Sequence, residues 1–362
     1  MPVNIIKIFD TPTLPLLSYL CSVISFIMSS LDNTIPEPGV SWVQIVRKYN
    51  HPNPLTSWVQ LFSNLILYSL AWFLMYISLS ISYWITLALA IPAAGMLVRL
   101  FIIFHDLGHG SYFRSRKLSS WSGIFLGILT FTPYYSWTRN HYIHHETVGN
   151  LDKRGIGDVW TMTVNEYKES SSWKKLTYRF YRNPVTMFLI GPLYVFLIGN
   201  RFTKRGMDQK GRMGVYLTNT GLLLFSVLTS LLIGVKAFLL IQFPIIYIAG
   251  ILGFWLFYVQ HQFNPTLWFR NNDWDYKKVA LEGSSFYKLP RVLQYFTGNI
   301  GFHHIHHLSP LIPNYNLARC HRENALFSEI RPLRFWPGFK TTTYRLWNEQ
   351  TLEMISFAKI SR

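Results

Sequence analysis

The chain has 362 residues, of which 50% are hydrophobic, 17% aromatic and only 14% charged. Soluble domains usually carry about 25% charged residues, so this composition excludes an ordinary soluble protein and indicates an integral membrane protein. The formal net charge is +17, but the basic residues lie in loops between apolar segments. A membrane surface explains that pattern more simply than nucleic acid does, and we expect no nucleic-acid partner.

The first 56 residues are predicted to be an N-terminal extension of uncertain role, and residues 57–362 the main domain. Residues 14–30 are moderately apolar and fit a signal-like segment, an interfacial helix or an extra span. A translated extension upstream of the true start, with Met28 as a candidate initiator, is a further alternative. We favour a peripheral or extraneous segment.

Four later stretches are long and apolar enough to cross a bilayer, which takes about 20 residues. They are 61–79, 83–104, 215–233 and 237–259, and short turns at 80–82 and 234–236 join them in pairs. The sequence therefore predicts an all-α, multi-pass membrane protein with four transmembrane helices in two hairpins.

Two shorter apolar stretches, 121–133 and 185–198, are interrupted by Gly or Pro and fit re-entrant or interfacial segments. If either one crossed alone, the histidine motifs described below would lie on opposite sides of the membrane. We expect that neither crosses.

Charge predicts the orientation. Between His105 and Val215 there are 16 Lys and Arg against 7 Asp and Glu, a net of +9. The positive-inside rule places these segments in the cytoplasm. From Leu308 onward the chain is polar and is expected to pack as a cytoplasmic cap.

Histidines are concentrated in three motifs, HDLGH, HYIHH and HHIHH, which begin at His105, His141 and His303. Residues at i, i+3 and i+4 share one face of a helix, so each motif presents its imidazoles in one direction. The face-sharing residues are His105, His109, His141, His144, His145, His303, His306 and His307. His304 falls off that face and is expected to be structural.

Eight imidazoles exceed the four ligands of a tetrahedral zinc ion and suit two metal ions, for which iron is a good candidate. His261 lies at the end of the last span, at the depth of the motifs, and would be a ninth ligand. Asp106 and Asp158 are candidate hydrogen-bond partners of ligated imidazoles. Glu146 is interpreted as a solvated surface charge.

An all-histidine di-iron site at a membrane surface points to oxygen activation and attack on an unactivated C–H bond. Desaturation and hydroxylation share this chemistry, and histidine spacing alone does not separate them. A hydroxylase of an alkyl, sterol or carotenoid substrate therefore stays open, as does a non-catalytic metal carrier or sensor.

The motifs and their order resemble those of the membrane fatty acid desaturases, with two spans between the second and third motif. Longer stretches are similar to bacterial acyl-lipid desaturases, in particular the delta-5 type of Gram-positive bacilli. These stretches are 104–114, 141–167, 181–197, 255–263 and 282–317. The resemblance runs from about Ser57 to the C-terminus.

The resemblance implies a cell-membrane enzyme that uses O2 and two iron ions to introduce a cis double bond into acyl chains, with membrane phospholipids as their expected carriers. It implies that the nine histidines named above are the iron ligands. Acyl-CoA desaturases have Asn four residues before the extra histidine, where this chain has Phe257. Since the chain has no cytochrome b5 signature, electrons should come from a separate ferredoxin, flavodoxin or cytochrome.

Overall fold

The computed structural model describes residues 41–360. The predictions for residues 14–30 and Met28 lie outside these residues. Contacts divide the chain into units Met1–Gln44 and Ile45–Arg362. Within the second unit, the Tyr49 hydroxyl donates to Glu323 over 2.8 Å and the Asn53 N–H donates to Tyr315 over 2.9 Å. Residues just before position 57 therefore contact the rest of the second unit, and the boundary at residue 57 and the role of residues 1–56 stay predictions.

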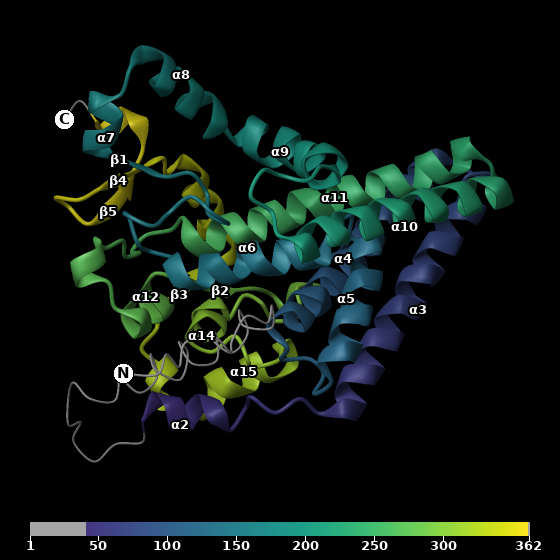
Figure 1. Cartoon of the computed structure of the whole chain (residues 1–362), viewed down its shortest axis with the longest axis horizontal. Coiled ribbons are helices and arrows are strands. Elements are labelled where there is room, and N and C mark those ends of the chain that lie inside the picture. The colour runs from purple at the N-terminus through teal and green to yellow at the C-terminus, as the bar shows by residue number, and fades with distance from the viewer. Residues whose placement is uncertain (1–40, 361–362) are drawn as a thin grey trace, which may run out of the picture. The chain divides into compact units, whose positions relative to one another are not determined.

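Four long helices dominate the second unit (Figure 1): α3 (Pro54–Ser78), α4 (Tyr83–His109), α10 (Gln209–Ile233) and α11 (Val235–His261). Among the described residues, these four are long and apolar enough to cross a membrane unbroken. The four predicted transmembrane helices are confirmed in number and position, and this is a membrane protein.

The ends of these helices follow from local chemistry. Pro54 occupies the first turn of α3, where Asn53 accepts a capping hydrogen bond from the Thr56 N–H. Asp208 caps α10 in the same way. Gly234, with φ of 87°, alone separates α10 from α11, so the turn is shorter than the predicted 234–236.

Shorter elements fill the chain between the hairpins. After α5 (Arg116–Leu129) and α6 (Tyr134–Thr147) come β1 (Met162–Thr163), α7 (Val164–Glu169) and α8 (Ser172–Tyr181). Irregular helical turns follow as η1 (Thr186–Ile190), α9 (Gly191–Leu193), η2 (Tyr194–Ile198) and η3 (Gly199–Arg201). The α8 axis and the segment 186–201 are bent by 62° and would add a fifth span only if the pair crossed as one.

Hydrogen bonds bring the end of this bent segment back to the turn before α6. Asn200 donates to the carbonyl of Phe131 over 3.2 Å, and Arg201 donates to the same carbonyl over 2.6 Å. The segment therefore ends close to the turn that starts α6. With its 14 residues, α5 spans only about 21 Å, which is less than a bilayer core. This length agrees with the prediction for 121–133, and the prediction that 185–198 does not cross stays a prediction.

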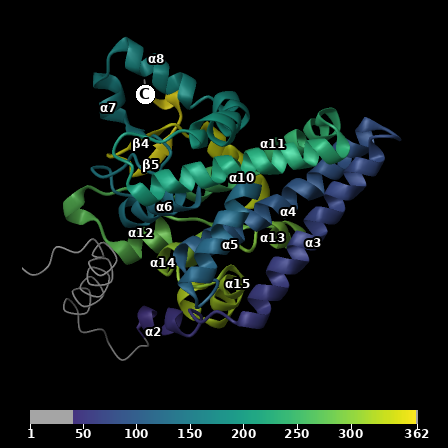
Figure 2. The ribbon, with the colours of Figure 1, turned by 45° about the vertical axis from the view of Figure 1, so that its right-hand side comes forward.

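The remaining chain caps the histidine-bearing ends of α4 and α11 (Figures 1 and 2). Its helical elements are η4 (Asn271–Asp273), α12 (Tyr276–Glu282), α13 (Arg291–Phe296), α14 (His303–Leu308), α15 (Asn314–Glu323), η5 (Ala325–Phe327), α16 (Phe335–Gly338), η6 (Phe339–Thr343) and η7 (Phe357–Lys359). Short strands join them as β2 (Phe286–Lys288), β3 (Pro332–Arg334), β4 (Leu346–Asn348) and β5 (Glu353–Ile355).

These strands form two small sheets. β1 pairs with β4 in parallel and β4 with β5 antiparallel, while β2 pairs with β3 in parallel. The first sheet joins residues 162–163 to residues 346–355, which lie more than 180 positions later in the chain. The fold is mostly helical, as predicted, and the small strands were not predicted.

The turn between α5 and α6 gives a test of packing. A Cβ at Gly127 would lie 2.5 Å from the backbone carbonyl oxygen of Thr132, whereas a Cβ at Gly253 in α11 would meet nothing within 4 Å. We expect Gly127→Ala to destabilise the protein by about 1–3 kcal/mol, because backbone must move. Gly253→Ala should be neutral or slightly stabilising. Thermal unfolding in detergent measures both, and equal midpoints would contradict the packing described.

Candidate metal centre

Nine histidines from four helices form two compact groups. The five-imidazole group contains His105, His109, His141, His145 and His306; the four-imidazole group contains His144, His261, His303 and His307. In each group the potential ligand atoms lie within 4.8 Å of one another. The structure brings together all nine histidines selected from the sequence, and residues of the second and third motifs divide between the groups.

Local structure explains how each motif is presented. α4 continues to His109 and ends at Gly110, which adopts a left-handed φ of 71° that favours glycine. His141, His144 and His145 lie in α6, and His261 is the last residue of α11. α14 is only six residues long, and all of its histidines are buried. The predicted i, i+3, i+4 faces are present.

The ring nitrogens converge too densely to be satisfied by hydrogen bonds alone. The Nε2 atom of His303 lies 2.9 Å from that of His261 and 3.0 Å from that of His307. In the other group, His145 Nε2 lies 3.2 Å from His141 Nε2 and 3.0 Å from His306 Nε2. A neutral imidazole has one donor and one acceptor nitrogen, so several facing lone pairs lack a proton. A cation at the centre of each group would satisfy them.

Electrostatics keeps these rings neutral. Burial, together with the neighbouring imidazoles, lowers the pKa of His145, His306 and His307 well below the usual 6.5. Protonation would place charges side by side in a buried site. At neutral pH the rings therefore offer lone pairs, the form that binds metal ions.

Each group contains one imidazole paired with a carboxylate. His105 Nδ1 lies 3.1 Å from Asp106 Oδ1 in the five-imidazole group. His144 Nδ1 lies 2.6 Å from Asp158 Oδ1 in the four-imidazole group. A carboxylate on Nδ1 fixes the tautomer that leaves Nε2 free to ligate. Both carboxylates selected from the sequence thus contact histidines of the two groups.

Asn314 is a supporting residue that the sequence reasoning missed. Its backbone N–H and its side-chain amide donate to Asp106 Oδ2 over 2.7 and 2.9 Å. The Gln60 amide in turn donates to Asn314 Oδ1 over 2.8 Å. Asn314 and Asp106 are more than 200 positions apart, so local sequence patterns do not predict their contact. The one signal in the sequence is that Asn314 follows the third histidine motif closely.

Aromatic side chains line both groups. Trp137 stacks on His141 with ring centroids 4.5 Å apart and an interplanar angle of 20°. Phe257 lies against His144 and His261, at centroid distances of 5.4 and 5.3 Å. The four-imidazole group therefore has a hydrocarbon wall at the position where the resemblance would place a polar Asn.

Two other predictions concern residues outside the groups. His304 belongs to neither group; it is fully buried and contacts the rings of Phe286 and His321. Glu146 is exposed and accepts a hydrogen bond from the Tyr142 hydroxyl over 2.7 Å. Both observations match the structural and surface interpretations given to them.

Arg182 was counted among the basic residues that set the topology, but it is only 1% exposed. Its guanidinium donates to Gln262 Oε1 over 2.8 Å and to the Tyr344 carbonyl over 3.0 Å. It also donates to the Trp160 carbonyl over 3.3 Å. Arg182 therefore links the end of α8 to the residues that follow His261 and Asp158, and it does not contribute charge to the surface.

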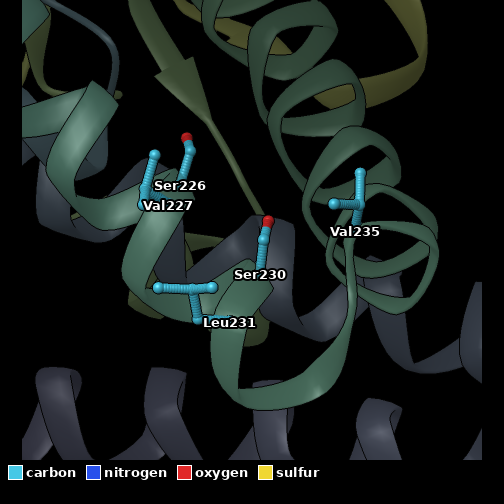
Figure 3. Close-up of a pocket in the computed structure, with 5 residues that line it drawn as sticks. All are labelled: Ser226, Val227, Ser230, Leu231 and Val235. Carbon is cyan, nitrogen blue, oxygen red and sulfur yellow. The ribbon is translucent and has the colours of Figure 1, made fainter.

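One groove of about 330 Å³ lies far from the histidines (Figure 3). It is lined by Ser226, Val227, Ser230, Leu231 and Val235, at the turn between α10 and α11. From Val235 to His261, α11 runs about 40 Å. This groove is therefore not part of the metal centre.

Comparison with known proteins gives the family. The family model described as fatty acid desaturase matches residues 81–338. A fatty acid desaturase of Bacillus subtilis (strain 168) is 45% identical over 91% of this chain and 94% of its own length. An sn-1 acyl-lipid omega-3 desaturase (ferredoxin) and an sn-1 oleoyl-lipid 12-desaturase of Synechocystis are 28% and 26% identical. Each alignment covers 61% of this chain, and 62% and 63% of the respective relative.

The matched region contains all nine clustered histidines and the spans that carry them. The chain belongs to the fatty acid desaturase family.

Proposed function

We propose that this desaturase binds two iron ions and uses O2 to introduce a cis double bond into acyl chains that are esterified in membrane phospholipids. The observation that carries the proposal is the division of nine clustered imidazoles into two adjacent groups, each with one carboxylate-paired ring. Nitrogen ligands in this number suit two five- or six-coordinate iron ions.

The residues of each group have distinct tasks in this proposal. The five-imidazole group would bind one iron and the four-imidazole group the other, and the iron pair supplies the oxygen chemistry that attacks a C–H bond. Asp106 and Asp158 keep the Nδ1 proton on His105 and His144 so that each Nε2 faces the metal. Phe257 covers one side of the four-imidazole group and excludes water there.

The position of the groups favours a substrate that remains in the bilayer. His105 and His109 end one apolar span and His261 ends another. An acyl chain of a phospholipid could therefore reach the site along the protein–lipid boundary while its headgroup stays at the surface. The names of the cyanobacterial relatives, which act on acyl lipids, agree with such a substrate.

The cytoplasm is the proposed side for the histidines, and a ferredoxin-like protein the proposed electron donor. The net charge of +9 between His105 and Val215 supports the orientation. Three relatives, two of them cyanobacterial and one from a plant, carry ferredoxin in their names. Small acidic electron carriers fit a basic surface through electrostatic steering.

Metal content tests the ligands. Purified protein should contain two irons per folded chain, and His144→Ala, His261→Ala and His306→Ala should each lose at least one of them together with desaturation. His304→Ala is the control: it should keep both irons and lose mainly thermal stability, because the ring is buried outside both groups. The measurement is iron analysis of monodisperse protein. If any of the three variants keeps two irons, the histidine replaced in it is not an iron ligand.

Cysteine labelling from the two sides of the membrane tests the orientation. A cysteine introduced at Lys204 should react only with reagents that reach the cytoplasm, and one at Lys236 only with reagents applied outside. The reason is that α10 crosses once between the two positions. Reaction of the Lys204 position from outside would overturn the orientation and leave the metal assignment untouched.

A reconstituted assay tests substrate and donor together. With O2 and reduced ferredoxin, labelled phosphatidylglycerol in vesicles should be desaturated, and free acyl-CoA should not. Raising the salt from about 0.05 to 0.5 M should slow turnover several-fold if encounter with the donor is electrostatic. Turnover of acyl-CoA without turnover of phospholipid would overturn the proposed substrate.

A further inference from the structure

Helix α8 presents an apolar face away from the protein. Trp173, Leu176 and Phe180 are 75%, 57% and 62% exposed, and at 100° per residue they lie within about 60° of one another. Tyr178 is on the opposite side of the helix and is completely buried in a core that includes Met162 and Leu346. In both views, α7 and the strand β4 lie on one side of α8, and the other side faces outward (Figures 1 and 2).

Exposed apolar side chains continue beyond α8 along the segment that packs on α11. After the 62° bend, the next segment exposes a series of apolar side chains, namely Val185, Leu189, Ile190, Tyr194, Leu197 and Ile198. The segment packs on α11, where Phe188 contacts Trp255 with ring centroids 5.6 Å apart. A Cβ at Gly250 would lie only 2.9 Å from Pro192. The exposed face of α8 is thus continuous with a segment that packs on a membrane-spanning helix.

Positive charge borders the apolar face. The α8 sequence, SWKKLTYRFY, contains Lys174, Lys175 and Arg179 and no acidic residue. Lys175 donates to the Lys168 carbonyl over 2.8 Å, and Arg179 donates to the Tyr167 hydroxyl over 2.6 Å. Both acceptors lie in α7, so these two cations are positioned between α8 and α7. Helices that lie in a membrane interface combine an aromatic and aliphatic face with Lys and Arg on the rest of the helix surface.

We infer that α8 is an interfacial helix that inserts Trp173, Leu176 and Phe180 into the leaflet on the histidine side, where Lys174, Lys175 and Arg179 contact anionic phospholipid headgroups. Arg182 follows the last residue of α8 and donates a hydrogen bond to Gln262, the neighbour of His261. Arg182 therefore connects the proposed lipid-contacting helix to the metal centre. This inference does not depend on the reaction that the protein catalyses.

Collision accessibility of spin labels tests the inference. Single cysteines replace Leu176 or Phe180 in full-length protein from which the native cysteines have been removed by the substitutions Cys21→Ser and Cys320→Ser. Leu352, between β4 and β5, is the matched control because its exposed fraction of 59% is close to the 57% of Leu176. Each labelled protein must be monodisperse and contain as much iron as the unlabelled protein.

In nanodiscs that contain phosphatidylglycerol, labels at 176 and 180 should relax with lipid-soluble O2 more than with a water-soluble nickel chelate, and the label at 352 should show the reverse. In nanodiscs of phosphatidylcholine alone, or in 1 M salt, both α8 labels should lie nearer the water because the attraction to anionic headgroups is lost or screened. Nickel accessibility at 176 equal to that at 352 would overturn the inference. Protection from both reagents would also overturn it, because a protein surface would then cover the face. No effect of lipid charge would overturn the anionic contact.

Discussion

The structure depends on nine imidazoles that converge from four helices. Their ring nitrogens lie so close together that several of them face another lone pair and not an N–H donor. Burial lowers the pKa of His145, His306 and His307, so these rings stay neutral and their lone pairs face neighbouring imidazoles. Such a cluster is unfavourable by itself, because buried acceptors without donors cost free energy. A bound metal ion would supply the missing positive charge, and its affinity would then be coupled to folding of the cap around the ends of α4 and α11.

The two groups are alike in one respect and different in another. Each has a single ring backed by a carboxylate, Asp106 in one and Asp158 in the other. One group has five imidazoles, while the other has four and is bordered by Phe257. The two groups consequently differ in the number of imidazoles they offer and in the aromatic side chains beside them.

Hydrogen bonds between buried polar groups hold the cap to the membrane helices. The chain from Gln60 through Asn314 to Asp106 joins α3, α15 and α4. Arg182 does the same on the other side of the centre, where its acceptors are an amide and backbone carbonyls. These contacts pair the Nη1 and Nη2 groups of the buried guanidinium. They fix the ends of α8 and α11 relative to each other.

The sequence by itself determined the number and position of the four spans, since a bilayer demands long uninterrupted apolar stretches. It also determined which histidines share a face, because helical spacing is local. The nine histidines and the two carboxylates found together in the structure were all selected from the sequence. Only the tertiary structure decided how His144 separates from His141 and His145 into another group, because that depends on where α11 and α14 end in space.

Tertiary structure likewise decided that Arg182 is buried and that Asn314 contacts Asp106, since both contacts join residues far apart in the chain. The small sheets follow the same rule: strands of two or three residues leave too weak a pattern in the sequence, and their pairing partners are distant. Local periodicity thus determined the four spans and the histidine faces, and long-range packing decided the grouping of ligands and their support.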